Sequence, residues 1–273
     1  MLQSSTPPLG TLVALGGGDD DAMLALLSDL LPALDSRVEI LAMASSDATR
    51  TGANYVRALR ELGCTNVHHL KIDERHSADK PAALRRLCDA SLLFFTGGDQ
   101  EMITESLRGT EFLRQLLHRY HTDAQFFIGG TSAGASVLGD LMLVDGHGWR
   151  ALRKGGIRTV PGLNVVPRLL IDQHFVERGR FGRLAHAVLA HPMCMGIGLA
   201  EETGIIVRAG QEAEVFGDGV VMVLDGAQVQ GCNLGQAGRG EPIAGQDLRV
   251  HLLVAGQRFL LRAPRLAGPE TAP

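Results

Sequence analysis

The sequence has 273 residues, of which 45% are hydrophobic, and a formal net charge of −4. This length and composition can bury one large core, so we predict a single domain over residues 1–262. The remaining residues, 263–273, hold three of the eleven prolines and are expected to form a mobile C-terminal tail. The acidic balance, with no basic run and no aromatic stacking platform, argues against nucleic acid as a partner.

The sequence also argues against a membrane as a partner. No run approaches the roughly 18 apolar residues that a membrane span requires. Residues 1–10 are polar and contain proline, with no basic start and no extended apolar region, so they do not resemble a secretory signal. We therefore expect a cytoplasmic protein.

The cysteines and histidines do not predict a metal site. The four cysteines lack Cys-x-x-Cys spacing and are interpreted as reduced core thiols; they are Cys64, Cys88, Cys194 and Cys232. The adjacent His68 and His69 would point to opposite faces of a strand, so they cannot share one ion. We expect neither a metal nor a cofactor.

The first half of the chain alternates short apolar runs with amphipathic stretches. Strand-like runs lie at residues 11–15, 38–44, 67–72, 91–96 and 125–128, and helix-like segments lie near residues 21–34, 49–63, 79–90 and 101–120. This alternation predicts an α/β fold with a mostly parallel sheet and helices on both faces.

Two further segments bear on the fold. Residues 16–18 are glycines followed by three aspartates, which predict a strand-to-helix turn with an aspartate N-cap, because the spacing does not fit a phosphate-binding loop. After about residue 195 the pattern changes to short β-runs, at residues 204–207, 212–216, 220–224 and 249–254. We expect these runs to form an antiparallel extension packed on the same core.

Residues 126–138 have the pattern of a nucleophile elbow. A buried strand turns through a glycine-rich corner that carries Ser132 and continues into a helix. The small residues around Ser132 leave room for a substrate to approach the backbone. The amide of Ala133, at the start of the helix, is placed to stabilise a developing oxyanion. This pattern indicates a serine hydrolase, although a small-residue turn in any α/β protein has a similar sequence.

A nucleophilic serine needs a base, and ten histidines compete for that role. His174 follows the apolar run at residues 169–171 and lies in the polar cluster Asp172-Gln173-His174. Because α/β folds place their chemistry at strand ends, His174 is the favoured base. Two carboxylates could orient it: Glu201, in a turn between buried segments, and Asp140, expected at the end of the elbow helix. The residues alone leave this choice open.

Five ordered segments carry a resemblance to a known family; they are residues 94–100, 129–136, 171–175, 177–184 and 196–203. The chain resembles the serine peptidase family that contains the cyanophycinases and the aspartyl dipeptidases, over roughly residues 10–225. The resemblance implies a fold like that of class I glutamine amidotransferases and flavodoxin. It also implies a catalytic triad of Ser132 as nucleophile, His174 as general base and Glu201 as orienting acid.

The resemblance assigns further positions. It implies a second oxyanion and substrate loop, in which the Asp99 amide completes the oxyanion hole and Gln100 reaches the substrate. The implied substrate-binding residues are Asp172, Gln173, Arg178, Arg180 and Arg183. At spacings of two and three residues, the three arginines cannot all share one helix face, so we expect at least one to point away from the site.

The family resemblance also implies the substrate and the assembly. The leading prediction is an exopeptidase that releases β-Asp-Arg dipeptides from cyanophycin, a poly-aspartate whose side-chain carboxylates carry arginines, or from another β-linked aspartyl peptide. The alternatives are an aspartyl or isoaspartyl dipeptidase and a non-catalytic binding protein on the same scaffold. A homodimer is expected. Residues 145–156 are basic and glycine-rich, match no pattern of the family, and are interpreted as a substrate-lining loop.

Overall fold

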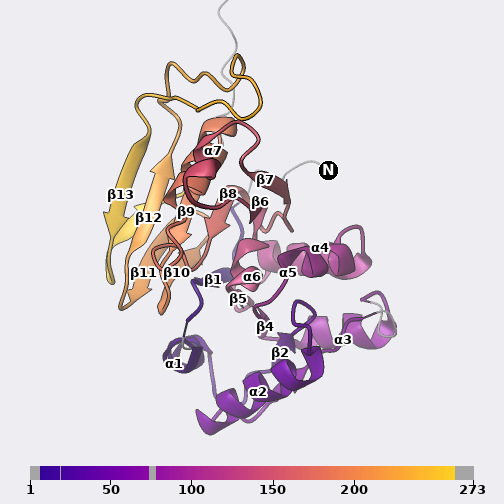
Figure 1. Ribbon diagram of the computed structural model, residues 1–273. Coiled ribbons are helices and arrows are strands. Elements are labelled where there is room, and N and C mark those ends of the chain that lie inside the picture. The colour runs from indigo at the N-terminus through magenta and orange to yellow at the C-terminus, as the bar shows by residue number, and fades with distance from the viewer. Residues whose placement is uncertain (1–6, 19, 74–77, 262–273) are drawn as a thin grey trace, which may run out of the picture.

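The computed structural model describes residues 7–18, 20–73 and 78–261 (Figure 1). The tail predicted at residues 263–273 lies outside the described residues, as does the aspartate N-cap predicted for the first helix. The described strands form two sheets, and helices cover their faces. This arrangement confirms the α/β fold class.

The first sheet has eight strands, in the order β14-β11-β10-β1-β5-β4-β2-β3. Their bounds are β1 Thr11–Leu15, β2 Val38–Leu41, β3 Val67–His69, β4 Leu92–Phe95, β5 Phe127–Thr131, β10 Thr203–Arg208, β11 Glu212–Gly217 and β14 Arg258–Leu260. Strands β1 to β5 pair in parallel, whereas β10, β11 and β14 extend the sheet in antiparallel fashion. The parallel strands bring their carboxyl ends to one edge, where sites form in such folds.

Five helices cover the two faces of the first sheet. They are α1 Asp20–Leu30, α2 Ala48–Glu61, α3 Pro81–Asp89, α4 Gln100–Leu107 and α5 Glu111–Thr122. The alternation of side chains along β1 explains the two cores: Val13 and Leu15 pack with α1 and α2, and Leu12 and Ala14 belong to the core that includes α3, α4 and α5. The parallel strands are buried on both faces, which accounts for their continuous apolar runs.

The second sheet has six strands, in the order β13-β12-β9-β8-β6-β7. Their bounds are β6 Gly139–Asp145, β7 Arg158–Pro161, β8 Val166–Asp172, β9 Met195–Leu199, β12 Val221–Asp225 and β13 Arg249–Leu253. One face shares a core with the first sheet, and the other is covered by α7 (Phe181–Ala190) (Figure 1). The C-terminal β-runs are therefore divided between the two sheets.

The helix predicted near residues 101–120 is two helices. The chain leaves α4 at Arg108 and passes through Gly109, which has a φ of +79°. Thr110 then caps α5, its Oγ1 accepting the amide of Leu113 at 3.2 Å. A glycine in a left-handed conformation followed by a threonine N-cap ends one helix and starts the next.

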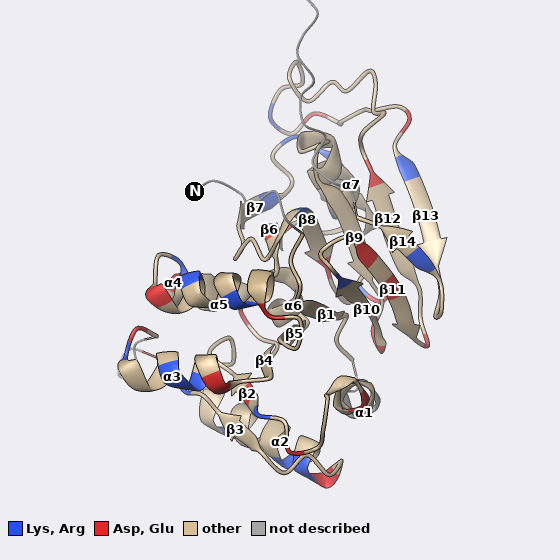
Figure 2. Ribbon diagram, turned by 180° about the vertical axis from the view of Figure 1, so that it is seen from behind, with Lys and Arg blue, Asp and Glu red and all other residues tan. Residues whose placement is uncertain are grey.

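Charge is kept away from the centre of the first sheet. Figure 2 shows Lys, Arg, Asp and Glu along the outer helices, whereas β1, β4 and β5 contain none of them. Glu39 in β2 is an exception: it is fully buried and paired with Arg37 and Arg86. Such a buried carboxylate is tolerated because both of its oxygens accept hydrogen bonds from arginine.

Candidate active site

Ser132 lies at the sharp turn between β5 and the short helix α6 (Ala133–Ser136). Its backbone has φ +52° and ψ −115°, a conformation that L-residues rarely adopt. The amide of Ser132 donates to the carbonyl of Leu15 at the end of β1, at 3.0 Å, and its side chain makes no capping hydrogen bond. The hydroxyl therefore projects from the turn instead of bonding its own helix.

Glycines allow this turn to pack tightly. A Cβ at Gly130 would lie 2.3 Å from the carbonyl oxygen of Gly134, and a Cβ at Gly134 would lie 2.2 Å from that of Phe95. A Cβ at Gly97 would come within 3.3 Å of the Ser132 Cβ. The sequence places glycine where two backbones approach, which is the geometry of a nucleophile elbow.

His174 follows the end of β8 and has a φ of +46°. Its amide donates to the carbonyl of Gly16 at 2.9 Å, which ties the second sheet to the end of β1. Its Nε2 lies 2.9 Å from Oγ of Ser132, within hydrogen-bond distance. Residues 42 positions apart in the chain are thus brought into direct contact.

Glu201 completes the arrangement from the turn between β9 and β10. Its Oε1 lies 2.5 Å from Nδ1 of His174, and its own carbonyl accepts the hydroxyl of Thr203 at 2.9 Å. An ionised carboxylate can only accept, so Nδ1 carries the proton and Nε2 is left to accept the proton of Ser132. The three groups form one hydrogen-bonded relay.

The glycine turn after β1 lines this relay. A Cβ at Gly17 would lie 2.7 Å from Nε2 of His174, and one at Gly18 would lie 2.9 Å from the Cβ of Glu201. Both glycines have positive φ, +91° and +103°. Sequence reasoning treated this turn only as a strand-to-helix connection; the run of glycines was the available signal of a close approach.

Asp140, the alternative acid, is not at a helix end. It is the second residue of β6, and one of its carboxylate oxygens is buried without a hydrogen-bond partner among the described residues. Burial raises the pKa of this carboxyl group, opposed by nearby backbone amides including that of Arg168. Nδ1 of His174 is bonded to Glu201, so the geometry favours Glu201 in the orienting position.

The two expected oxyanion donors differ. The amide of Ala133 has no backbone acceptor among the described residues. The amide of Asp99 donates to the carbonyl of Ala44 at 2.8 Å, so it is not free to hold an oxyanion. Its side chain instead caps α4 by accepting the amide of Glu101. The neighbouring Gly98 amide, for which the described residues provide no acceptor, is the available donor in this loop.

Gln100 is buried next to this loop. Its Nε2 donates to the carbonyl of Leu143 at 2.6 Å, which fixes the side chain against β6. One of the two N–H donors of this amide is therefore used within the protein. The amide oxygen can accept from donors such as guanidinium N–H groups.

Asp172 and Arg183 form a buried pair and do not line an open pocket. Asp172 is 1% exposed and Arg183 is 3% exposed, and Nε of Arg183 donates to Asp172 at 2.6 Å. Gln173 is also buried, and its amide donates to Oγ of Ser136 at 3.3 Å. These three residues, expected to bind substrate, are buried, and their hydrogen bonds with Ser136 and with one another surround the end of β8 just before His174.

The other two arginines lie closer to solvent. Arg180 donates to the backbone and side chain of Gln173, and its Nε is buried without a partner among the described residues. Burial lowers the pKa of Arg180 to about 10. Arg178 is exposed. The three arginines therefore occupy different environments, and only Arg183 lies within α7, so the predicted shared helix does not include Arg178 and Arg180.

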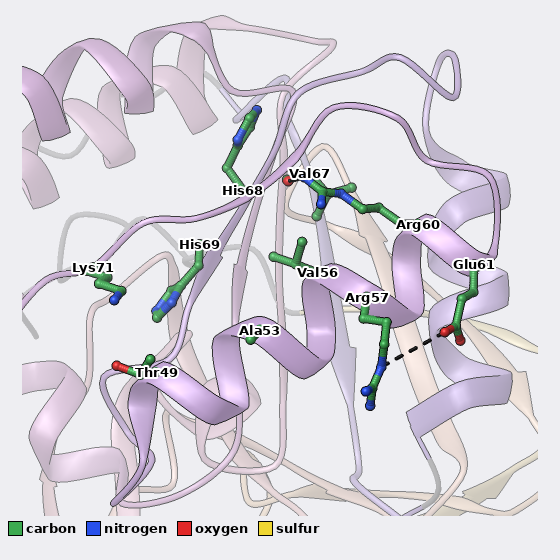
Figure 3. Close-up of a pocket in the computed structure, with 10 residues that line it drawn as sticks. All are labelled: Thr49, Ala53, Val56, Arg57, Arg60, Glu61, Val67, His68, His69 and Lys71. Atoms are coloured by element: carbon green, nitrogen blue, oxygen red, sulfur yellow. Dashed lines mark hydrogen bonds and ion pairs between the residues drawn. The ribbon is translucent and has the colours of Figure 1, made fainter.

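A separate cavity of about 630 Å³ lies between α2 and β3 (Figure 3). It is lined by several cations, among them Arg57, Arg60 and Lys71, and by both His68 and His69. His69 packs where a Cβ at Gly52 would lie 2.3 Å from its Nδ1, so a helix glycine makes room for the ring. The cavity shares no lining residue with the Ser132 relay, and Figure 3 shows Thr49 and Lys71 near His69.

Two features of the described part of the chain bear on metal binding and on membrane insertion. Over residues 7–18, 20–73 and 78–261, no three His, Cys, Asp or Glu side chains are grouped so that they could hold a metal ion. No helix in the same ranges is long and apolar enough to cross a membrane.

An α/β fold with a serine, a histidine and a carboxylate hydrogen-bonded in series is that of a serine hydrolase. The chain belongs to peptidase family S51, whose family model matches residues 12–215. It is 32% identical to a cyanophycinase of Synechococcus elongatus over 257 residues, 93% of this chain and 80% of that protein. It is 31% identical to a cyanophycinase of Trichormus variabilis over 254 residues, 92% and 85% of the two chains.

Solved structures support the fold. The crystal structure of a peptidase from an acI-B1 Actinobacterium superposes with a TM-score of 0.66 at 19% identity, covering 94% of this chain and 98% of the other. A putative peptidase E of Listeria monocytogenes EGD-e gives a TM-score of 0.55 at 16% identity, covering 77% and 98%. At these identities the likeness concerns the fold alone.

Proposed function

We propose that this peptidase hydrolyses cyanophycin and releases β-Asp-Arg dipeptides through an acyl-enzyme intermediate. The observation that carries the proposal is the relay from Ser132 through His174 to Glu201, with distances of 2.9 and 2.5 Å. Similarity to cyanophycinases over more than nine-tenths of the chain supports the choice of substrate.

The relay accounts for both halves of the reaction. His174 Nε2 takes the proton of Ser132 as Oγ attacks a backbone carbonyl of the substrate, and then gives that proton to the departing amine. A water molecule, deprotonated by the same nitrogen, releases the acyl group and restores the serine. Glu201 holds Nδ1–H throughout and stabilises the imidazolium that forms in each step.

Backbone amides supply the electrostatic part of the mechanism. The N–H groups of Ala133 and Gly98 flank Ser132 and are assigned to the oxyanion of the tetrahedral intermediate. Each such donor contributes roughly 10²- to 10³-fold to the rate in related chemistry. Gly97, whose α-carbon faces Ser132, keeps this loop close to the reacting carbon.

Substrate recognition is assigned to groups whose hydrogen-bonding capacity is not used up within the protein. The arginines of cyanophycin are attached through their amino groups, so each keeps a free carboxylate and a guanidinium. Arg178, which is exposed, is suited to the carboxylates, and the oxygen of Gln100 is suited to a guanidinium. Arg180, by contrast, is largely held by Asp172 and Gln173. Asp172, Gln173 and Arg183 act indirectly, by fixing the chain around His174.

The direct test is to incubate the purified protein with cyanophycin granules and to analyse the soluble products by mass spectrometry. We expect β-Asp-Arg dipeptide from the wild type and none from Ser132→Ala. Intact granules together with hydrolysis of short Asp-Xaa or isoAsp-Xaa peptides would assign the protein to the dipeptidases instead. If a serine-reactive phosphonate probe also failed to label Ser132, the protein would be a binding protein on a peptidase scaffold.

A further inference from the structure

Trp149, the single tryptophan of the chain, is 64% exposed. It belongs to the 3-10 helix η1 (Gly148–Leu152), within the basic segment 145–156 that matched no pattern of the family. A large aromatic side chain left in water loses the stabilisation that burial would provide. The exposure of Trp149 therefore calls for a structural or functional explanation.

The exposure of Trp149 does not result from a loose loop. Two residues that follow it closely are anchored: the carbonyl of Ala151 accepts a hydrogen bond from Nδ1 of the buried His186 at 2.7 Å, and the carbonyl of Leu152 accepts the amide of Ile243 at 3.0 Å. Arg153 donates to the carbonyl of Gly240 at 2.7 Å. The segment is held on two sides while it presents the indole ring to solvent.

The segment adjoins the residues around His174. Gly182, in the first turn of α7, lies so near η1 that a Cβ there would be 3.8 Å from the carbonyl of Gly148. A Cβ at Gly146 would lie 3.1 Å from the Cβ of Arg183, which is paired with Asp172. The segment that carries Trp149 thus lies against the start of α7 and against Arg183, the partner of Asp172, which lies two residues before His174.

Other apolar side chains are exposed in the same region. Val176, two residues after His174, is 49% exposed, and Phe181 at the start of α7 is 44% exposed. Leu152 is 44% exposed and packs near Gly182. We call Trp149, Leu152, Val176 and Phe181 the tryptophan surface. Leu152 lies beside Gly182, the chain neighbour of Phe181, and exposed apolar side chains on adjoining segments mark interaction sites more often than scattered ones do.

The charge of this region indicates which kind of ligand it would bind. The guanidinium carbons of Arg153 and Arg150 lie 4.8 and 5.5 Å from the centre of the Trp149 ring. Within the part of the chain that the structure describes, Arg150, Arg153 and Arg178 have no carboxylate partner. Unpaired arginines beside an exposed aromatic ring suit a ligand that bears both carboxylates and apolar stems or guanidinium groups.

We propose that the tryptophan surface, with Arg150 and Arg153, binds the part of an aspartyl polymer that lies beyond the unit being cleaved. Free carboxylates of the polymer pair with the arginines, while its arginyl side chains stack on Trp149. This subsite rests on the proposed function, because it supplies the contacts that distinguish a long substrate from a dipeptide. Its occupant is a carboxylate-bearing peptide chain.

Steady-state kinetics test the subsite with substrates of two lengths: soluble cyanophycin and a short β-Asp-Arg oligomer of a few units. We expect Trp149→Ala to raise KM for the polymer about five- to tenfold, with little change in kcat. Arg150→Gln should raise KM for the polymer about two- to fivefold and weaken the dependence of this KM on salt concentration. The short oligomer should show a much smaller rise.

Two variants serve as matched controls. Leu34→Ala removes an apolar side chain of 52% exposure that lies at the amino ends of the parallel strands, away from the site. Arg57→Gln removes a cation from the separate α2–β3 cavity. Neither should change KM for the polymer. An equal rise in Arg57→Gln and Arg150→Gln would show a general charge effect and would overturn the subsite.

Fluorescence gives a readout that does not depend on turnover. Because Trp149 is the sole tryptophan, titration of Ser132→Ala with soluble cyanophycin should change its emission saturably, and a free dipeptide should not reproduce the change at the same concentration. Glu201→Gln provides a second inactive background. An unchanged emission spectrum in both backgrounds overturns the subsite.

Failure of the proposed function would give a different result from failure of the subsite. If the wild type cleaved no aspartyl polymer but the emission still changed saturably with that polymer, the subsite would stand and the reaction would be reassigned. If the wild type cleaved the polymer and Trp149→Ala had the same KM for long and short substrates as the wild type, the reaction would stand and the subsite would be wrong.

Discussion

Gly17 lies against the imidazole ring of His174, so closely that a Cβ on Gly17 would stand 2.4 Å from Cε1. The glycine belongs to the turn after β1, whereas the histidine follows β8 of the other sheet. A residue that touches no substrate thereby limits where the general base can lie. The absence of a side chain at Gly17 leaves the space that the imidazole ring of His174 needs.

Gly17→Ala should reduce kcat by at least about tenfold, because the added methyl group displaces the ring from Ser132. It should also cost about 1 kcal/mol in stability, since φ is +91° at this position. Peptidase assays and urea unfolding would measure the two effects.

Gly109→Ala is the matched control for that substitution. Gly109 also has a positive φ, +79°, but a Cβ there would meet nothing within 4 Å. We expect the same loss of stability with unchanged kcat. If both variants lost activity equally, backbone strain and not displacement of His174 would be responsible.

The identity of the orienting acid can be decided by comparing Glu201→Gln with Asp140→Asn. Glutamine cannot stabilise the imidazolium, so we expect kcat to fall about 10²- to 10⁴-fold in the first variant. Asp140 lies in β6 without contact to the relay, so kcat should fall less than about twofold in the second. The opposite pattern would move the acid to Asp140.

Acid should destabilise the folded protein through His186. Burial lowers the pKa of His186 below its ordinary value of 6.5, opposed by its hydrogen bond to the Ala151 carbonyl, so the unfolded chain binds the proton more readily than the folded protein does. The stability associated with neutral His186 is present above the unfolded pKa and is lost as pH falls toward the folded pKa.

The measurement is Tm at about pH 7.5 and about pH 5.5 for the wild type and His186→Gln. We expect a smaller drop in the variant. His69 and His121, whose pKa values are also lowered by burial, should leave a residual drop in both proteins. Identical drops would show that His186 does not contribute to the pH dependence.

Glu39→Ala should destabilise the protein by about 3 kcal/mol, because it leaves Arg37 and Arg86 without the carboxylate they share inside the first sheet. Glu61→Ala removes an exposed carboxylate 4.0 Å from Arg57 and should cost less than about 1 kcal/mol. Urea unfolding of both variants gives the comparison. Equal costs would contradict the importance of the buried pair.

The elbow could be predicted from sequence because its requirements are local. Ser132 and the glycines around it are consecutive in the chain, and a tight turn restricts residue size at each position. His174 could be favoured because it follows an apolar run and strand ends meet at one edge, whereas the residues alone leave the acid open between Glu201 and Asp140 and the family resemblance points to Glu201. The distance between His174 and Glu201 could not be read from the chain, since it depends on how two sheets pack.

The remaining differences arise from long-range contacts. Nothing local shows that the Asp99 amide bonds Ala44, or that Arg183 is buried against Asp172. The division of the late strands between two sheets depends on pairing partners far away in sequence, such as β1 for β10 and β14 for β11. Hydrophobic patterning fixes which face of a strand is buried but not which neighbour it pairs with.

The relay crosses the boundary between the sheets: Ser132 follows a strand of the first, His174 follows a strand of the second, and Glu201 lies where the chain passes from one to the other. A hydrogen bond tolerates only a few tenths of an ångström of displacement, whereas an apolar contact tolerates more. The rate of turnover therefore reports how accurately the two sheets are positioned against each other. As the denaturant concentration rises, activity should be lost while circular dichroism still shows a folded chain.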